Sequence, residues 1–353
     1  MQINWSKFGK VGGGNVYLSS NLNPMTINSF KRAIAFLAVF VSMTAYSQQV
    51  DYSVVTVPEE SGMDFTMITS RNDYVCMPMV SRTRSGLNWY TNKIIDVSAD
   101  GSKIAFLAMR GDATNVFVKD LFKQGASVQR TNRKAVADFS YSPDGKWITF
   151  SETVLKNNVI FQTDANNGFI CRQITNGYSD FSPIYSIDGK KIFFSRAETA
   201  STSIWSYDLK DNFLSSYMSG FNPCVTKDDN TLLCVRVNGF GKGEIWKVNY
   251  MTGVEECIVS HTDKSFSTPS LSPDGKWILF VGSSPVPAGK TVYWNTDIYV
   301  CRTDGSQLTQ LTYHVAEDLS PEWSKDGKYI YFISQRGNAE GAANIWRMTF
   351  VTL

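Results

Sequence analysis

The chain has 353 residues, of which 43% are hydrophobic and 19% are charged. This composition is typical of a folded globular protein and excludes a disordered or fibrous one. Lys and Arg together number 34 against 32 Asp and Glu, and four of the basic residues lie before residue 48. The rest of the chain has no basic excess to hold a phosphate backbone, so we expect no nucleic-acid partner.

The N-terminal region has the three parts of a secretory signal peptide. Lys31 and Arg32 precede the apolar run 33–41, and small residues follow that run. Nine apolar residues are too few to span a membrane. We therefore predict a signal peptide over residues 25–47, a mis-called leader over residues 1–24, no membrane span, and a mature protein in the periplasm or the medium.

Six cysteines follow the predicted signal peptide, which is too few for a disulfide-based scaffold. Most are expected to be small buried hydrophobic residues. Cys224 and Cys234 flank one predicted hairpin turn, and a bridge between them depends on a strand register that sequence does not fix.

Residues 94–353 repeat one pattern of strand, tight turn and strand six times, as in YSPDGKWITF and LSPDGKWILF. The repeat is marked by a turn aspartate: Asp100, Asp144, Asp188, Asp228, Asp274 and Asp326. Aspartate accepts hydrogen bonds from the turn backbone, and the glycine that usually follows adopts a positive φ. The fourth copy has Asp229 in place of that glycine, so we expect Asp229 or Asn230 to adopt the strained conformation.

A third and a fourth strand follow each hairpin. The third is marked by an aliphatic residue followed by an aromatic one, as in Ile204 and Trp205. The fourth ends in an aliphatic residue followed by Thr, as in Leu311 and Thr312. Four strands in each of six repeats predict an all-β fold, a six-bladed β-propeller of four-stranded antiparallel blades.

The last repeat ends after its third strand. Residues 48–93, which precede the first repeat, contain Ile68 and Thr69, a fourth-strand ending without earlier strands. We therefore predict that residues 64–70 form the outer strand of the last blade and close the ring. Residues 76–93 are either a degenerate extra strand or an insertion in the first blade.

The SPDGK hairpins and the aliphatic-aromatic strands resemble the WD-like repeats of TolB-like proteins over residues 94–350. The resemblance implies a periplasmic six-bladed propeller that binds proteins of the Tol-Pal envelope system. The α/β domain that precedes the propeller in TolB has no counterpart here. Similar repeats occur in prolyl-oligopeptidase-type peptidases and oligogalacturonate lyases, so the resemblance implies the architecture and leaves the activity open.

The sequence lacks the usual short catalytic motifs: a Gly-x-Ser-x-Gly elbow, HExxH, a P-loop or paired CxxC. A prolyl-oligopeptidase would also need a hydrolase domain, for which no sequence remains. We therefore expect no catalytic residues, no cofactor and no metal.

Recognition residues are expected on one face of the ring, the face that carries the variable loops. The longest loops there are predicted at 282–295, with Tyr293 and Trp294, and at 334–344, with Arg336. Arg110 and Asp112 border a shorter turn on the same face. The alternative is that the two aromatic residues only pack their own loop, and that the Arg-Gly-Asp triplet is a plain turn.

The two histidines, His261 and His314, fall in links between blades on the same face. Asp318 and Asp180 precede prolines near the expected channel mouth and could cap strands or hold a cation. The leading interpretation is a monomeric, non-catalytic scaffold that binds a protein or cell-envelope partner. The alternative is a carbohydrate-active lyase or hydrolase that uses the two histidines and nearby carboxylates.

Overall fold

A computed structural model describes residues 52–78, 80–82, 88–168, 171–176, 178–199, 201–288 and 291–351. The predicted leader and signal peptide lie outside these residues. Within them, six sheets each contain four antiparallel strands, and two short 3-10 helices, η2 (Pro58–Glu60) and η3 (Arg71–Asp73), precede the first sheet.

The sheets follow the repeats. Blade 1 contains β4 (Ile95–Val97), β5 (Lys103–Arg110), β6 (Ala113–Asp120) and β7 (Val128–Gln129). Blade 2 contains β8 (Val136–Tyr141), β9 (Trp147–Val154), β10 (Asn157–Asp164) and β11 (Cys171–Gln173). Blade 3 contains β12 (Ser179–Tyr185), β13 (Lys191–Ala197), β14 (Thr202–Asp208) and β15 (Phe213–Ser219).

The other three blades repeat this order. Blade 4 contains β16 (Phe221–Val225), β17 (Thr231–Val237), β18 (Gly243–Asn249) and β19 (Glu255–Val259). Blade 5 contains β20 (Ser265–Leu271), β21 (Trp277–Ala288), β22 (Thr291–Arg302) and β23 (Thr309–Gln310). Blade 6 contains β24 (Asp318–Trp323), β25 (Tyr329–Ser334), β26 (Asn344–Thr349) and, as its outer strand, β1 (Phe65–Met67).

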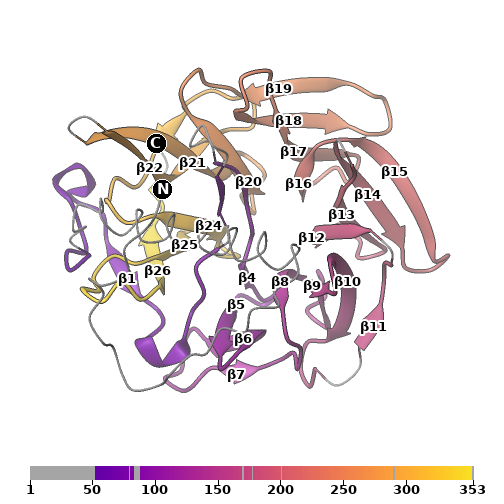
Figure 1. The fold of residues 1–353 in the computed structure, drawn as a ribbon, viewed down its shortest axis with the longest axis horizontal. Helices are drawn as coiled ribbons and strands as arrows, with labels where there is room; N and C mark the ends of the chain where they lie inside the picture. Colours follow the sequence, from indigo (N-terminus) through magenta and orange to yellow (C-terminus); the bar gives the residue numbers. More distant parts are fainter. Residues whose placement is uncertain are drawn as a thin grey trace, which may run out of the picture. The chain divides into compact units, whose positions relative to one another are not determined.

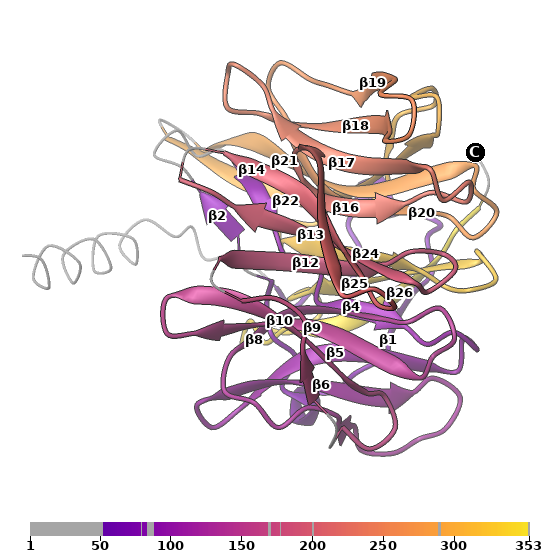
Figure 2. The ribbon, with the colours of Figure 1, turned by 90° about the vertical axis from the view of Figure 1, so that its right-hand side faces the viewer.

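The first strands of the six sheets surround a common axis. β4 contacts β8, and the contacts continue through β12, β16, β20 and β24 back to β4. Figure 1 shows the six sheets arranged around this axis, and Figure 2 shows them from the side. The described residues therefore form the six-bladed β-propeller that the repeats predict.

The aspartate turns form for the predicted reason. Asp100 accepts hydrogen bonds from the Ser102 backbone, at 3.0 Å, and from the Ser98 hydroxyl, at 2.6 Å, while Gly101 has φ +71°. Asp229, which replaces glycine in the fourth copy, has φ 55°. That aspartate therefore adopts the expected left-handed conformation, which aspartate tolerates better than most residues.

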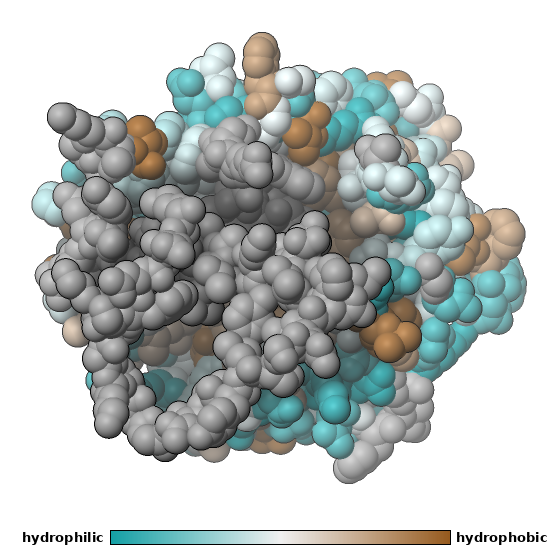
Figure 3. Space-filling model, viewed as in Figure 1, coloured by the Kyte–Doolittle hydropathy of each residue, from teal (hydrophilic) through white to brown (hydrophobic). Residues whose placement is uncertain are grey.

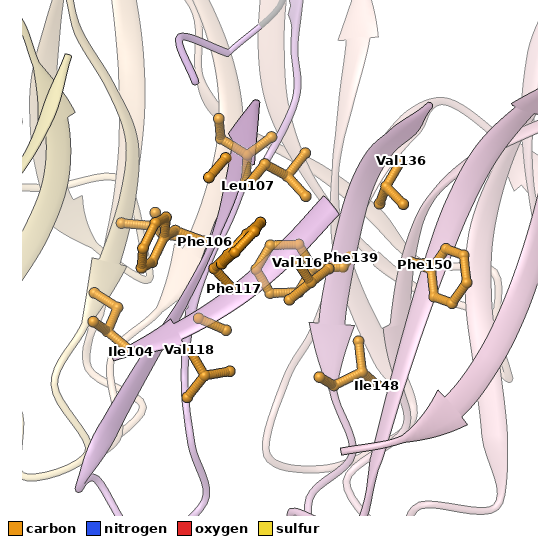
Figure 4. Close-up of a cluster of buried hydrophobic side chains, with 14 of the residues drawn as sticks. Ile104, Phe106, Leu107, Val116, Phe117, Val118, Val136, Phe139, Ile148 and Phe150 are labelled. Carbon is orange, nitrogen blue, oxygen red and sulfur yellow. The ribbon is translucent and has the colours of Figure 1, made fainter. Parts of the chain in front are cut away.

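Hydrophobic residues of the first three strands of each blade form the core between neighbouring blades. Figure 4 shows Phe106 and Phe117 of blade 1 near Phe139 and Phe150 of blade 2, and all four are at most 1% exposed. Each such side chain contributes roughly 1.5–3 kcal/mol by its burial.

The predicted closing strand is confirmed. β1 pairs antiparallel with β26, with Phe65 opposite Met348 and Met67 opposite Trp346. The Thr69 hydroxyl accepts a hydrogen bond from the Ile345 backbone at 2.8 Å, which extends this contact by two residues. The ring is thus closed by strands from the two ends of the described chain.

β2 (Val80–Arg82) and β3 (Asn88–Thr91) form a separate two-stranded sheet. β3 contacts β20 and β18 of blades 5 and 4. This pair of strands precedes the first blade and is neither an extra strand of a blade nor an insertion within blade 1, the two predicted alternatives.

Cys224 and Cys234 are free thiols. Cys224 is opposite Leu233 in the β16–β17 pair, so Cys234 points to the other side of the sheet. The pleat therefore keeps the two sulfur atoms apart.

The propeller has two distinct faces. We call the face that carries the six aspartate turns the turn face. We call the opposite face, which carries the connections between second and third strands and the links between blades, the loop face. Figure 3 looks onto the loop face, where exposed hydrophobic side chains form separate groups among hydrophilic ones.

Candidate functional site

The loop face has an apolar patch where blades 4 and 5 meet. We define it by four residues: Phe240 and Lys242 in the β17–β18 connection, and Val292 and Trp294 in β22. Phe240 is 84% exposed and Val292 is 59% exposed. The Lys242 ammonium lies 4.7 Å from the centre of the Trp294 ring, a cation–π contact that joins the two blades.

Hydrogen bonds hold the β17–β18 connection in place. The Glu244 carboxylate accepts hydrogen bonds from the Asn238 amide at 3.0 Å, the Ser260 hydroxyl at 2.7 Å and the Trp246 indole at 3.1 Å. Burial alone would raise the pKa of Glu244, but these hydrogen bonds lower it overall. The charged Glu244 carboxylate therefore binds the β17–β18 connection to the link between blades 4 and 5. These hydrogen bonds fix the position of the loop that carries Phe240.

The expected loop at 282–295 is instead mostly strand. β21 and β22 pair over twelve residues, with Pro285 opposite Trp294 and Val286 opposite Tyr293. Successive side chains of a strand point to opposite sides, so Tyr293 points away from the side on which Trp294 meets Lys242. The structure therefore separates the two aromatic residues that sequence had grouped.

The two histidines have different environments. His261 is half-buried, and its Nδ1 accepts hydrogen bonds from the Asp263 and Lys264 backbones at 3.0 and 3.3 Å. His314 is completely buried, and its Nδ1 accepts one from the Ala316 backbone at 2.9 Å. Burial, aided by Arg336, lowers the pKa of His314, so this side chain is neutral at neutral pH.

Arg336 and Asp318 are not surface residues, which corrects their expected role as contact residues. Both side chains are completely buried together with Glu60 of η2. The Arg336 guanidinium lies 2.5 Å from Asp318 Oδ2 and 3.0 Å from Glu60 Oε1. It also donates to the Val55 carbonyl at 3.1 Å. Buried charges require such partners, so Arg336 holds the segment 52–60 on blade 6 and contributes no contact surface.

Asp297 of β22 lies beside this charged cluster. Its pKa is raised to about 9, first by burial and then by the nearby Asp318 carboxylate. A protonated carboxyl group is therefore present at neutral pH. Asp180, the other aspartate considered as a possible cation ligand, instead pairs with Arg196 at 2.7 Å.

Arg110 and Asp112 lie on the loop face at the β5–β6 turn, and both are exposed. The Arg110 guanidinium stacks 4.2 Å from the centre of the Phe117 ring and donates to the Ser127 hydroxyl at 3.3 Å. Gly111 between them has φ +65°. The triplet forms a tight turn on blade 1, away from the blade 4–5 patch.

Sequence analysis missed a polar ring around the propeller axis. It consists of the residues six positions before five of the turn aspartates: Asp138, Ser182, Asn222, Thr268 and Ser320. The first four line a cavity of about 30 Å³ together with Lys93. Four of the five are followed by proline, a pattern visible in the sequence.

The charged groups at the axis have an ion-pair or hydrogen-bond partner. Lys93 lies 2.7 Å from Glu322, and the Asp138 carboxylate accepts hydrogen bonds from the Ser151 hydroxyl and from the Ser182 backbone, the latter at 2.8 Å. Burial raises the pKa of Asp138 to about 6 despite these hydrogen bonds. These groups hold the first strands together.

Neither a metal cluster nor a membrane helix is present among the described residues. No three His, Cys, Asp or Glu side chains in that part of the chain form a set that could hold a metal ion. No helix found there has the length and apolar character needed to cross a membrane.

Comparisons with known proteins agree with this architecture. The family model described as the TolB beta propeller domain matches residues 29–293. An uncharacterized protein of Agrobacterium fabrum is 27% identical over 207 residues, which cover 55% of this chain and 64% of that protein. The chain thus spans less than two thirds of that relative's length.

Two solved structures share the fold at low identity. TolB from Acinetobacter baumannii superposes with a TM-score of 0.56 at 19% identity, over 70% of this chain and 64% of that one. An oligogalacturonate lyase from Vibrio parahaemolyticus superposes with a TM-score of 0.55 at 14% identity, over 85% of this chain and 98% of that one. Likeness at this identity shows the fold alone.

Proposed function

Because the chain belongs to the TolB β-propeller family, we propose that it is an exported, monomeric, non-catalytic scaffold that binds a protein or cell-envelope partner through the loop face. The observation that carries the proposal is the blade 4–5 patch, where Phe240 is 84% exposed beside the Lys242–Trp294 contact. An exposed aromatic side chain on a fixed loop is typical of a protein contact, since it buries a large apolar area at little cost in entropy.

The non-catalytic part of the proposal is supported by the state of the histidines. His314 is completely buried, and the Nδ1 atoms of both His261 and His314 accept backbone hydrogen bonds within their own loops. A general base needs a ring nitrogen within reach of a substrate proton. The fold similarity to an oligogalacturonate lyase keeps a carbohydrate-active enzyme as the alternative.

The test uses the chain from Gln48 onward, tagged at its C-terminus, to capture partners from a cell-envelope extract of the organism that makes it. Phe240→Ser removes the most exposed aromatic residue of the patch. We expect the captured partner to be reduced about ten-fold or more, since loss of a central aromatic contact commonly costs 2 kcal/mol.

The matched control is Phe122→Ser on the turn face, where Phe122 is 81% exposed. This variant should capture the partner as the unaltered chain does. Equal capture by both variants would contradict the proposal. Turnover of a polysaccharide that is lost in a His261→Ala variant would instead support the enzymatic alternative.

A further inference from the structure

A groove of about 560 Å³ lies on the turn face between blades 2 and 3. This volume is within the range of small-ligand sites. Its apolar walls include Trp147, Ile187 and Leu209, and its polar groups include Gln162, Arg172 and Tyr185. The groove is opposite the face used in the proposed function, so it requires its own explanation.

The repeat provides an internal reference for this groove. Most of the lining residues have counterparts 44 positions earlier that line a groove of about 190 Å³ between blades 1 and 2, whereas the counterpart of Arg172 is Val128, which does not line it. There, Lys103 takes the place of Trp147 and Val118 takes the place of Gln162. Arg130 donates to the Asn166 carbonyl at 2.6 Å in that groove. The blade 2–3 groove has therefore diverged from its repeat in size and in chemistry.

Trp147 is the main departure from the repeat. Trp277 holds the same position in blade 5, three residues after the turn aspartate, and is 3% exposed. The Arg302 guanidinium lies 4.0 Å from its ring centre and the Phe350 ring lies 5.6 Å away. Trp147 is only half-buried, and within the described part of the chain no cation or aromatic ring stacks on it. Its indole therefore faces the groove.

The charge of the groove comes from Arg172. The carboxylates at its rim, Asp144 and Asp188, accept hydrogen bonds within their own turns and pair with Lys146 and Lys190 at 3.3 and 2.9 Å. Arg172 donates only to neutral groups, the Tyr207 hydroxyl at 2.9 Å and the Asn212 amide oxygen, and no carboxylate in the described ranges lies within 4 Å of it. The groove therefore has one uncompensated positive charge.

The floor of the groove adds directed polar groups. The Gln162 amide donates to the Tyr185 hydroxyl at 2.9 Å, and both side chains are largely buried. This hydrogen bond fixes the hydroxyl so that its own proton is available to an acceptor in the groove. A ligand with one anionic group and an apolar body matches these features.

We propose that the groove binds the free C-terminal carboxylate of a peptide or protein whose last side chain is apolar. The carboxylate pairs with Arg172, in the geometry that guanidinium groups favour, and the apolar side chain packs on Trp147 and Leu209. A saccharide fits less well. It has many hydroxyl donors, and the rim carboxylates that would accept from them already accept from their own turns.

The experiment measures binding of fluorescein-labelled tetrapeptides that end in leucine, one with a free carboxylate and one with a C-terminal amide. We expect the free acid to bind the full-length protein about ten-fold more tightly than the amide, the value of one charge-assisted hydrogen-bonded pair. Arg172→Gln should abolish this difference, and Trp147→Ala should weaken binding of both peptides. Arg130→Gln, in the smaller groove, is the matched control and should leave both affinities unchanged.

Arg172 is exposed, so its replacement should not unfold the protein, and circular dichroism checks this. Equal affinity for the two peptides would overturn the proposal, as would absence of binding at millimolar peptide. Displacement by an oligosaccharide and not by free N-acetyl-leucine would also overturn it. The Phe240→Ser variant should bind the acid peptide normally, so failure of the loop-face proposal and failure of this one are distinguishable.

Discussion

Blades 3 and 6 each bury an arginine against an aspartate that lies eight residues before the turn aspartate. In blade 3, Arg196 pairs with Asp180 at 2.7 Å across adjacent strands, and the Trp205 ring covers it at 4.4 Å. In blade 6, Arg336 pairs with Asp318 and also with Glu60, which is 276 residues earlier in the chain. The arginine–aspartate pair thus joins neighbouring strands within blade 3, whereas in blade 6 it also binds the segment that closes the ring.

The covering ring of Arg336 is also part of the closure. Its guanidinium lies 4.4 Å from the centre of the Phe65 ring, and Phe65 belongs to β1. In blade 6 the arginine therefore joins three separate segments, whereas in blade 3 it joins two neighbouring strands. Removing each arginine should have different consequences.

Arg336→Met should have the largest effect. It leaves the Glu60 and Asp318 carboxylates buried without their cation, which typically costs about 3–5 kcal/mol. Chemical denaturation should show this loss in the free energy of unfolding. Limited proteolysis should also cut within residues 52–60 at concentrations of denaturant that leave the blades folded. A variant as stable as the parent would contradict the role assigned to Arg336.

Arg196→Met should destabilise the protein by about 3 kcal/mol, because only one carboxylate, that of Asp180, is left buried. The same proteolysis should leave residues 52–60 protected. Cleavage of this segment in the Arg336→Met variant and its protection in the Arg196→Met variant would separate the roles of the two arginines most clearly. Equal release of the segment in both variants would show that closure does not depend on the blade 6 cluster.

Glu60→Gln keeps the size of the side chain but removes one charge opposite Arg336. The Tyr313 backbone donates to Glu60 Oε1 at 2.8 Å, and glutamine can still accept this hydrogen bond. We expect a loss of about 2 kcal/mol, the value of a hydrogen bond to a charged group. Thermal unfolding measures it. If Glu60→Gln lowered the free energy of unfolding as much as Arg336→Met does, most of the stabilisation by this charged cluster would depend on the Glu60 charge.

Asp297→Asn should have the smallest effect at low pH and should stabilise the protein as the pH rises. The pKa of Asp297 is raised to about 9 in the folded state, so the folded protein holds a proton that the unfolded chain releases near pH 4. The parent therefore loses stability as the pH rises between these values, whereas the amide does not titrate. Denaturation at several values between pH 4 and pH 8 should show a difference that grows by about 1.4 kcal/mol for each pH unit. A constant difference would contradict the shifted pKa.

The repeated elements of the fold were predictable from sequence, because turn chemistry and strand periodicity are local. The aspartate turns and the left-handed Asp229 follow from residues close together in the chain, and the closing strand at residues 65–67 follows from the fourth strand that the last repeat lacks. The candidate site was less predictable. Trp294 and Lys242 come from different blades, and nothing local indicates that Lys242 reaches the Trp294 ring.

Burial of charged residues was the main failure of the sequence-based interpretation. Arg336, Asp318 and His314 follow the pattern of exposed loop residues, yet all are completely buried. What buries Arg336 is the segment 52–60, whose position depends on the three-dimensional closure of the ring. The blade 2–3 groove was missed for a related reason: Trp147 follows the repeat in sequence, and only the packing of its neighbours leaves it uncovered.

The pairing of β1 with β26 has a consequence for how the protein is made. Ribosomes synthesise β1 before the other strands of the six blades, and its partner β26 is the last of the described strands to be made. β1 therefore has no partner strand until β26 has been made, and contacts between residues so distant in sequence form slowly. During that interval the nascent chain exposes an unpaired strand, and chaperones that bind unpaired strands would act at this stage.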